Sequence, residues 1–537
     1  MDWRIINDLD YNHYMQEYKI NALLAKVFAY KQYSSQEIET MLSSRLVYHD
    51  FSLFSEAEMT LERIHEAIGN KEKICIYGDY DCDGICATAI LCKAFEACQI
   101  EYGFYIPKRI EEGYGLHVDV LEKALLKGYR NIITVDNGVR SIEAMKFVKD
   151  HQMRLIISDH HTFEMDQIDC DCLIHPFLAD DTFHNCCGAG MALQIARCLI
   201  PDNKEIVALA ALATIADSMP VTRENRNIIR NGIEYLNEGC MPALHALKNK
   251  PQDTFNIKMM SYTIIPKINS MGRLSDRVNV NNAVRYLLLK DQNAILNVAR
   301  QINKINDLRK EMSGEMEKIA NGEIKNVPFE IIASHDFHEG IVGLVASKMA
   351  SAHHRPFLVL SELENEYKGS MRSVEGFDLI RFFSDFDGFE RFGGHAQAAG
   401  VTIKKENLEA LKNYIDTHEM IYEENKILEC EYALEQAFSI QTVMEYMELA
   451  PFGNGFEEIL FYIQNIQIRD KISLANGKYY KVISTSGIEY LFFHSSLIPL
   501  IQDGMNIIGK VSLNDYRGQL HICIVVEDVI MENMYVQ

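Results

Sequence analysis

Three short apolar runs, each ending in charged or polar residues, constrain the fold of this chain most strongly. They are KICIY before GDYDCDG (73–84), NIITV before DNG (131–138) and RLIIS before DHH (154–161). Helical segments lie between them, for example ICATAILCKAFEAC (85–98) and SIEAMKFVKDHQ (141–152). Strands that alternate with helices predict a parallel, doubly wound sheet, in which ligands bind beyond the carboxyl ends of the strands. The three polar clusters are therefore expected to meet at one edge of one sheet.

The rest of the chain divides into segments of different character. Residues 204–220, KEIVALAALATIADSMP, predict a buried helix that ends near Asp217. Charged helical sequence follows, then a second α/β pattern, and finally short alternating strands that predict a small β-barrel. We expect these boundaries: a helical segment 1–45, a first α/β domain 46–245, a helical connector 246–328, a second α/β domain 329–425 and a barrel 426–537.

Composition limits the class of protein. At 537 residues the chain is long for one hydrophobic core, so several domains are expected. Its net charge of −23 argues against a generic nucleic-acid coat but leaves room for a narrow basic groove or a metal-mediated site. No apolar run reaches the roughly 18 residues of a membrane-spanning helix, and we expect no signal peptide. The 13 irregularly spaced cysteines predict reduced thiols in a cytoplasmic protein and no structural zinc site.

Acidic and histidine residues follow the predicted strands and the helix near 204–220. Up to six carboxylates and two imidazoles belong to this set: Asp79, Asp81, Asp83, Asp136, Asp159, His160, His161 and Asp217. Carboxylates this close cannot all stay ionised unless cations lie between them. Oxygen and imidazole ligands without thiolates favour Mn²⁺ or Mg²⁺ over zinc. Two such ions would clamp the attacking and leaving oxygens of a phosphoryl transfer.

Simpler interpretations exist for each cluster taken alone. An aspartate after a strand, such as Asp136, is usually a helix cap or a turn former, and two adjacent histidines are often surface residues. DYDCDG also resembles the start of a calcium-binding loop, but an EF-hand requires glutamate at its twelfth position. That position is Ile90 counted from Asp79, or Cys92 counted from Asp81. The joint occurrence of all the clusters favours the two-metal hypothesis.

The motifs, in their order, resemble a known family. DYDCDG, VDNG, SDHH and ATIADSMP are similar to the four motifs of the DHH phosphoesterase superfamily. HEGIVGLVASK, KGSMRSVEGFDL and FGGHAQAAG resemble the DHH-associated domain in the form found in the RecJ family of 5′→3′ single-stranded-DNA exonucleases. LAPFGNG and the strands after it resemble the oligonucleotide-binding domain of that family. The resemblance implies an α/β fold: a DHH domain with a doubly wound parallel sheet and a DHH-associated domain, joined by a long helix, plus a C-terminal OB-like β-barrel.

The resemblance also implies roles for individual residues. The metal ligands would be Asp79, Asp81, Asp83, Asp136, His160 and Asp217. Asp136 would bridge two metal ions, Mn²⁺ or Mg²⁺. His161 would face the scissile phosphate, and Asp159 would orient the histidines. Some members of the superfamily carry a histidine ligand where this chain has Tyr77, which leaves the shell of one metal less certain.

Substrate-binding residues are implied mainly in the second α/β domain. The set comprises Arg109, Arg273, Ser370, Arg372, Gly393, Gly394 and His395. Arginines of this family hold the 5′-terminal phosphate, and the two glycines would allow a close backbone approach. Surface ion pairs and a tight glycine turn are the alternatives. In the barrel, some of five aromatic residues would stack on bases: Tyr479, Tyr480, Phe492, Phe493 and Tyr516.

The function expected from the resemblance is metal-dependent 5′→3′ hydrolysis of single-stranded DNA carrying a 5′ phosphate, in DNA repair and recombination. One alternative is another DHH phosphoesterase, acting on short oligoribonucleotides, cyclic dinucleotides or pyrophosphate. A second is a non-catalytic accessory protein of replication related to RecJ, whose expected signature is loss of the metal ligands. Single-strand-binding protein and a RecQ-type helicase are the implied partners, and a monomer without membrane association is expected.

Overall fold

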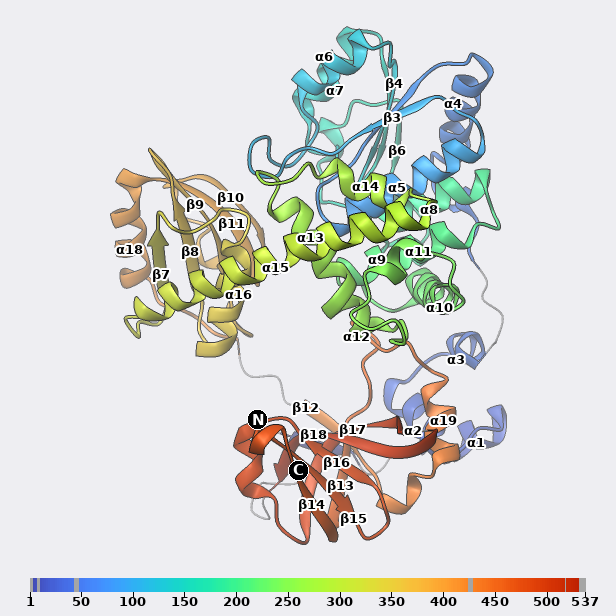
Figure 1. The fold of residues 1–537 in the computed structure, drawn as a ribbon, viewed down its shortest axis with the longest axis vertical. Helices are drawn as coiled ribbons and strands as arrows, with labels where there is room; N and C mark the ends of the chain where they lie inside the picture. Colours follow the sequence, from blue (N-terminus) through green and yellow to red (C-terminus); the bar gives the residue numbers. More distant parts are fainter. Residues whose placement is uncertain (1–2, 7–9, 43–47, 424–427, 517, 531–537) are drawn as a thin grey trace. The chain divides into compact units, whose positions relative to one another are not determined.

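The computed structural model describes residues 3–6, 10–42, 48–423, 428–516 and 518–530. The domain boundaries predicted at residues 45 and 425 fall outside these ranges. The chain forms two compact units (Figure 1): one contains residues 48–425, and the other combines residues 1–47 with residues 426–537. Each unit is described by itself. Among the described residues, no helix is both long and apolar enough to cross a membrane.

A five-stranded sheet, parallel throughout, forms the first layer of the larger unit. Its strands follow the order β3-β2-β4-β5-β6. Their bounds are β2 Ile74–Tyr77, β3 Tyr102–Tyr105, β4 Asn131–Val135, β5 Arg154–Ser158 and β6 Cys172–Ile174. The chain runs outward in opposite directions from β2 and β4, so these two neighbours flank the point where the strand order reverses. Asp79 and Asp136, which follow these two strands, therefore lie at the predicted ligand edge.

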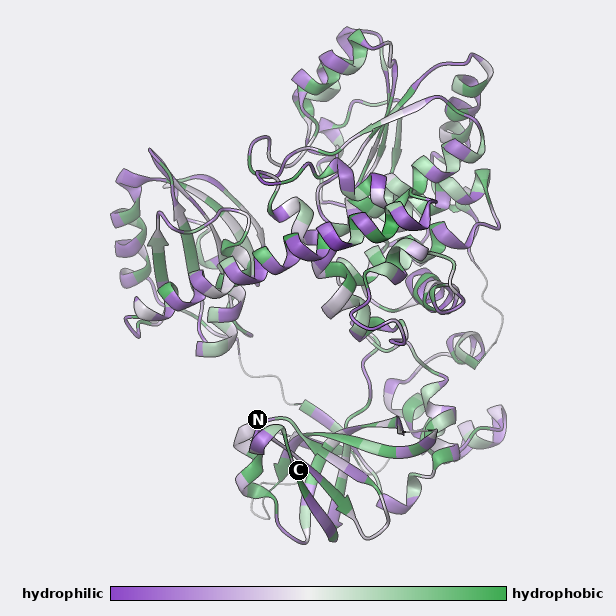
Figure 2. Cartoon of the chain, viewed as in Figure 1, coloured by the Kyte–Doolittle hydropathy of each residue, from purple (hydrophilic) through white to green (hydrophobic). Residues whose placement is uncertain are grey.

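Helices cover both faces of this sheet because successive strand residues point to opposite sides. Ile74 and Ile76 join a core with α4, α5 and α8, whereas Cys75 and Tyr77 join a core with α6 and α7. These helices are α4 Ala57–Gly69, α5 Cys82–Ala97, α6 Val118–Leu126, α7 Ile142–Asp150 and α8 Gly188–Leu199. In Figure 2 the strands between the helices are mostly in the green of hydrophobic residues. The buried α9 (Lys204–Ala216) packs between α5 and α10 (Arg223–Asn237).

A helical connector leads to the second sheet. It comprises α11 Pro242–Ala246, α12 Ile257–Met259, a π-helical turn Met260–Ile264, α13 Ile265–Arg273, α14 Asn281–Leu287 and α15 Gln292–Gly322. The 31 residues of α15 make the long joining helix (Figure 1). Its first turns, with Ile295 and Ile302, pack in the core of the first sheet, and its last turns, with Met316 and Ala320, pack against α16.

The second sheet is mixed, in the order β10-β11-β9-β8-β7. Its strands are β7 Glu330–Ser334, β8 Phe357–Glu362, β9 Glu366–Arg372, β10 Phe389–His395 and β11 Ala398–Lys404, and only the pair β7–β8 is parallel. Helix α16 (Val342–His353) covers β7 and β8 on one face. The opposite face packs against α17 (Leu379–Phe382) and α18 (Leu408–Thr417).

The smaller unit contains an eight-stranded sheet in the order β1-β12-β13-β17-β18-β16-β15-β14. Its elements are β1 Trp3–Ile6, β12 Leu428–Tyr432, β13 Phe461–Ile466, β14 Ile468–Leu474, β15 Tyr479–Ser484, β16 Glu489–Phe492, β17 Met505–Tyr516, β18 Gln519–Ile530, α1 Asn12–Tyr18, α2 Ala22–Lys31, α3 Ser35–Leu42 and α19 Ile440–Met447. Strand β1 pairs in parallel with β12, and α2 packs against α19. The first residues of the chain thus contribute a strand to this sheet in addition to the expected helices.

Candidate metal centre and phosphate site

The first acidic cluster is held by backbone groups at two helix starts. Asp81 caps α5, and its carboxylate accepts hydrogen bonds from the amides of Asp83 (2.9 Å) and Gly84 (3.1 Å). The Asp83 carboxylate accepts from the amides of Gly188 and Ala189 at the start of α8, both at 2.7 Å. These amides belong to helix N-termini, which favour negative charge. Backbone amides therefore hold these two carboxylates in fixed orientations.

Asp136 lies directly after β4 with a left-handed backbone (φ 62°), which is uncommon for a residue other than glycine. Its amide donates to the carbonyl of Ser158, and its side chain is buried. Gly188 lies against it, and a Cβ atom added at Gly188 would be 2.4 Å from the Cβ of Asp136. The fold accepts local backbone strain here and thereby places this carboxylate over the start of α8.

His160 lies among three carboxylates. Its Nε2 is 3.1 Å from Asp136 Oδ1, 3.8 Å from Asp83 Oδ2 and 3.8 Å from Asp217 Oδ2. Asp217 reaches this group from the C-terminal end of α9. The sequence-predicted ligands from four separate segments are thus brought to one edge of the sheet.

Potential ligand atoms lie within 4.8 Å of one another in three triplets: Asp136–His160–His161, Asp83–His160–Asp217 and Asp79–Asp81–Asp136. Asp136 and His160 each belong to two of the triplets. Asp136 Oδ1 and Asp79 Oδ1 are buried, and among the described residues neither accepts a hydrogen bond, since the His160 Nε2 near Asp136 Oδ1 belongs to a neutral ring. Such atoms are costly to bury unless a cation satisfies them. Oxygen and imidazole donors in this arrangement fit Mn²⁺ or Mg²⁺.

The electrostatics of the cluster also call for cations. Burial, with the neighbouring Asp81, raises the pKa of Asp79 well above its usual value. Burial and the surrounding aspartates raise the pKa of Asp136 in the same direction. For Asp217, burial together with Asp83 and Asp81 raises the pKa to about 8. Burial lowers the pKa of His160, so its imidazole is neutral near pH 7 and has a lone pair available for a metal.

His161 is oriented by two partners. Its Nδ1 lies 2.8 Å from Asp159 Oδ1 and 2.9 Å from the hydroxyl of Tyr114. Asp159 is fully buried and also accepts from the amides of Val139, His160 and His161. Burial would lower the pKa of His161, but the hydrogen bond and charge of Asp159 outweigh it and raise the pKa. His161 can therefore present a protonated ring near the metal ligands, and Asp159 has the orienting position expected for it.

Tyr114 was not predicted as a site residue, although its hydroxyl contacts the core of the site. It donates to the backbone carbonyl of Asp136 at 3.2 Å and lies beside His161. The sequence signal is weak, since GYG (113–115) is a loop motif without a charged residue. We infer that Tyr114 limits the rotation of the His161 ring.

Replacing Tyr114 by phenylalanine should remove these contacts and keep the ring. One hydrogen bond contributes about 1 kcal/mol, so kcat for the phosphodiester hydrolysis expected from the sequence should fall about fivefold. Thermal stability should change little. Steady-state kinetics and a thermal melt would measure both quantities. A variant with unchanged kcat would show that the hydroxyl has no role in positioning His161.

Tyr77 occupies the position at which the resemblance implies a histidine ligand in some members of the superfamily. In this chain the side chain belongs to the hydrophobic core. Its side chain is fully buried under α6, and its hydroxyl accepts a hydrogen bond from the amide of His117 at 3.3 Å. It is therefore turned to the side of the sheet that carries α6 and α7. Asp79, Asp81 and Asp136 still form a ligand triplet without it.

A cluster of arginines lies near the acidic edge. Burial and the charges of Arg109, Arg309 and Arg372 lower the pKa of Arg273 to about 9. Burial and Arg109 likewise lower the pKa of Arg372. Within the described part of the chain, none of these four guanidinium groups has a carboxylate within 4.0 Å. Guanidinium groups that lie close together without a carboxylate partner can bind an anion such as phosphate.

Close backbone contacts tie the arginines to the metal ligands. A Cβ atom on Gly272 would lie 2.1 Å from the carbonyl oxygen of Tyr80, and one on Gly340 would lie 1.9 Å from that of Arg273. Asn269 also accepts a hydrogen bond from the amide of Cys82 at 2.8 Å. The loop that carries Asp81, the helix α13 and the start of α16 are thus packed against one another without intervening side chains.

Four of the remaining predicted substrate residues share one face of the second sheet: Ser370, Arg372, Gly393 and His395. Across β10, β11 and β9, Gly393, Gly400 and Ser370 lie in one row, and His395, Ala398 and Arg372 lie two residues further along. Arg372 donates to Ser370 Oγ at 2.7 Å. A side chain at Gly393 would meet no atom within 4 Å, so this face is open. Gly394 is different, because its φ of 155° and its contact with Ala398 require glycine for the strand pairing itself.

Comparison with known proteins agrees with these motifs. Three family descriptions match in order: the DHH family N-terminal domain at residues 73–216, the DHHA1 domain at 325–418 and the RecJ OB domain at 428–528. The chain contains a DHH domain, a DHHA1 domain and a RecJ OB domain. Its DHH, DHHA1 and RecJ OB domains confirm the predicted two α/β domains and C-terminal OB-like barrel.

The relatives of this DHH protein include proteins named single-stranded-DNA-specific exonucleases. It is 29% identical over 527 residues to the single-stranded-DNA-specific exonuclease RecJ of Bacillus subtilis. The matched region covers 91% of this chain and 66% of that protein. It is 25% identical over 551 residues to RecJ of Escherichia coli, which covers 92% of this chain and 93% of that protein. The chain therefore spans about two thirds of the length of one relative and nearly all of the other.

Solved structures share the fold of this DHH protein. RecJ of Thermus thermophilus in complex with Mn²⁺ superposes with a TM-score of 0.84 at 21% identity, covering 99% of this chain and 80% of that chain. An exonuclease RecJ bound to manganese is 26% identical with a TM-score of 0.59, covering 67% of this chain and 94% of that chain. Metal ions are thus present in structures of proteins that resemble this one.

Two residues of the phosphate and metal sites were not found from the sequence. Besides Tyr114 in the DHH domain, Arg309 on α15 contributes to the arginine cluster, and its guanidinium donates to the buried Asn306 at 2.6 Å. In the OB domain, the aromatic residues predicted to stack on bases differ in exposure. Phe492 is buried in the core, whereas Phe493 is 44% exposed. The side chain of Tyr516 lies outside the described residues.

Proposed function

We propose that this DHH protein is a metal-dependent exonuclease that hydrolyses single-stranded DNA from its 5′ end. The observation that carries the proposal is that three ligand triplets overlap. Asp136 belongs to two of these triplets, and His160 also belongs to two. Burial and neighbouring arginines lower the pKa of Arg273 and of Arg372, as expected where positive charges gather. A paired metal site and an adjacent phosphate site are the two features that hydrolysis next to a terminal phosphate needs.

The proposed roles follow from the contacts. Asp79, Asp81, Asp83, Asp136, His160 and Asp217 would hold two divalent ions. When bound, such ions polarise the phosphodiester and lower the pKa of water for attack on it. Asp159 and Tyr114 keep the ring of His161 turned toward the site, where its charge would stabilise negative charge that develops on the phosphate.

The 5′ polarity would come from the arginine cluster. Arg109, Arg273 and Arg372 would bind the terminal phosphate, with Ser370 as a further donor. Gly393 and Gly400 leave the neighbouring face open, so that a strand backbone could lie on it beside His395. Because α13, which carries Arg273, is packed against the loop of Asp81, the distance from the terminal phosphate to the scissile bond would be fixed.

The two rival functions are less consistent with these observations. A non-catalytic accessory protein is expected to have lost metal ligands, whereas here the carboxylates and imidazoles converge. Enzymes for short oligoribonucleotides or cyclic dinucleotides typically lack the terminal barrel, and this chain matches the RecJ OB domain over residues 428–528. The free thiols of the 13 cysteines suit a reducing compartment, and we propose the cytoplasm. A monomer, with single-strand-binding protein and a RecQ-type helicase as partners, is proposed from the resemblance alone.

The function is tested with purified full-length protein and single-stranded oligonucleotides labelled at either end. With Mn²⁺ we expect mononucleotides from the 5′ end, no release after EDTA, and roughly tenfold slower release from strands with a 5′ hydroxyl, since charge-assisted contacts to the phosphate are lost. Duplex DNA, RNA and cyclic dinucleotides are the comparison substrates. Release that starts at the 3′ end, or activity on cyclic dinucleotides alone, would contradict the proposal.

A further inference from the structure

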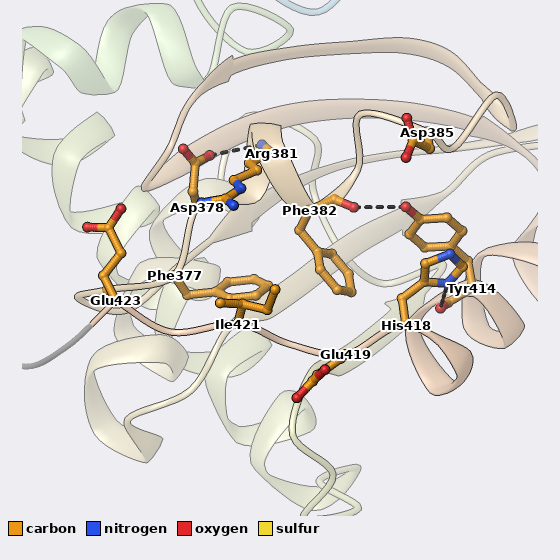
Figure 3. Close-up of a pocket in the computed structure, with 11 residues that line it drawn as sticks. Phe377, Asp378, Arg381, Phe382, Asp385, Tyr414, His418, Glu419, Ile421 and Glu423 are labelled. Atoms are coloured by element: carbon orange, nitrogen blue, oxygen red, sulfur yellow. Dashed lines mark hydrogen bonds between the residues drawn. The ribbon is translucent and has the colours of Figure 1, made fainter.

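A cavity of about 300 Å³ opens in the DHHA1 domain (Figure 3). Its core residues lie on the face of the sheet opposite to Ser370 and Arg372. Met371, which lies between them on β9, points to the opposite face and is fully buried in one core with Phe377 and Leu379. The thickness of the sheet therefore separates the cavity from the proposed substrate face. Its lining comes from α17, α18 and the loops beside them: Gly376, Phe377, Asp378, Arg381, Phe382, Asp385, Tyr414, His418, Glu419, Ile421 and Glu423.

Aromatic rings that are held in place form the floor. The ring centroids of Phe377 and Phe382 are 5.1 Å apart, and those of Phe382 and Tyr414 are 5.8 Å apart. The hydroxyl of Tyr414 donates to the carbonyl of Phe382 at 2.9 Å, and His418 stacks on Tyr414 at 3.8 Å. The aromatic faces are thus pre-organised, so that an occupant would not have to order them.

The rim of the cavity is mainly acidic, although the exposed Arg381 also lines it. It carries four carboxylates, and in the described part of the chain none of them has a basic side chain within 4.0 Å. They are Asp378, Asp385, Glu419 and Glu423. Asp378 accepts one hydrogen bond, from the backbone amide of Arg381 at 3.0 Å. Burial and the charge of Asp385 raise the pKa of Tyr414, as expected where negative charge gathers.

We propose that this cavity binds a basic segment of a partner protein, with an arginine or lysine side chain lying over the aromatic floor. A cation gains from the faces of aromatic rings and from carboxylates at the same site. The exposed Ile421 and Tyr422 next to the cavity add an apolar surface for the neighbouring residues of the segment. Nucleic acid is disfavoured because its phosphates would face four carboxylates. The proposal does not depend on the exonuclease activity.

The test is a fluorescence-anisotropy titration of the full-length protein with a labelled peptide in which arginine alternates with leucine. The double variant Asp385→Asn/Glu419→Gln should bind it about tenfold more weakly, because two contacts to charge are lost. The control Glu364→Gln/Glu406→Gln removes the same charge from exposed positions of this domain outside the cavity. It should bind the peptide like the unaltered protein.

A photo-crosslinking residue in the peptide locates the contact. Crosslinks to residues 376–423, lost in the cavity variant and kept in the control, would support the proposal. Equal weakening in both double variants, or crosslinks elsewhere, would overturn it, because the peptide would then follow net charge alone. Sedimentation velocity tests whether a second copy of this chain occupies the cavity. Self-association of the unaltered protein that the cavity variant abolishes would also overturn the proposal.

Discussion

Replacing Asp136 by asparagine should reduce Mn²⁺-dependent release of nucleotides by roughly a thousandfold, the largest effect we expect from a single substitution in the site. The side chain keeps its shape but loses the charge that two of the three ligand triplets share. The metal-free protein should remain folded. Its buried carboxylate is crowded by other aspartates, which raise its pKa, so a neutral side chain relieves repulsion in the absence of metal.

Thermal melts separate this effect from misfolding. Mn²⁺ at about 100 times its dissociation constant should stabilise the unaltered protein by about 2.7 kcal/mol and leave the Asp136→Asn variant unchanged. Asp202→Asn is the matched control, because Asp202 lies at an exposed turn and forms no ion pair with any residue that the structure describes. This variant should retain both activity and the metal-induced shift. Full activity in the Asp136→Asn variant would refute its role as a ligand.

Replacing Gly188 by alanine should damage the same site without touching a ligand. The new Cβ would lie 2.4 Å from the Cβ of Asp136 and 2.7 Å from its Oδ1, in a region with no room to adjust. Overpacking of this kind costs about 2 kcal/mol, and the displaced carboxylate should lower kcat about a hundredfold. Denaturant unfolding and steady-state kinetics measure the two effects.

Gly190 offers a control two residues further along α8. A Cβ atom there would lie 3.4 Å from the nearest atom, the Cβ of Cys186, which is an ordinary contact. Because alanine is the better helix former, Gly190→Ala should be neutral or slightly stabilising and fully active. Equal behaviour of the two variants would mean that contact with Asp136 is not what requires glycine at position 188.

The first sheet was predictable because its central strands are short apolar runs with polar ends. Strands β2, β4 and β5 coincide with KICIY, NIITV and RLIIS, and their carboxyl ends bring the aspartates together as expected. The edge strands β3 and β6 are only 4 and 3 residues long, and nothing in YGFY or CLI distinguishes them from loops. Their existence is decided by pairing with neighbours.

Features that depend on distant pairing could not be found in the sequence. Strand β1 joins the sheet of the smaller unit through β12, whose residues are more than 400 positions away. Arg309 occupies a helix whose charged pattern is typical of a solvent-exposed face, and only the packing of α15 places it near Arg273. Tyr114 belongs to a loop, and its contact with His161 arises from the tertiary fold. Local patterns carry no information about such contacts.

The most direct test of the metal centre is an anomalous-scattering map of crystals of this protein grown with Mn²⁺. We expect two anomalous peaks at the carboxyl edge of the first sheet, with Asp136 between them and His160 beside one of them. Peaks confined to other parts of the molecule, or one peak that Asp136 does not contact, would contradict a two-metal site bridged by this aspartate.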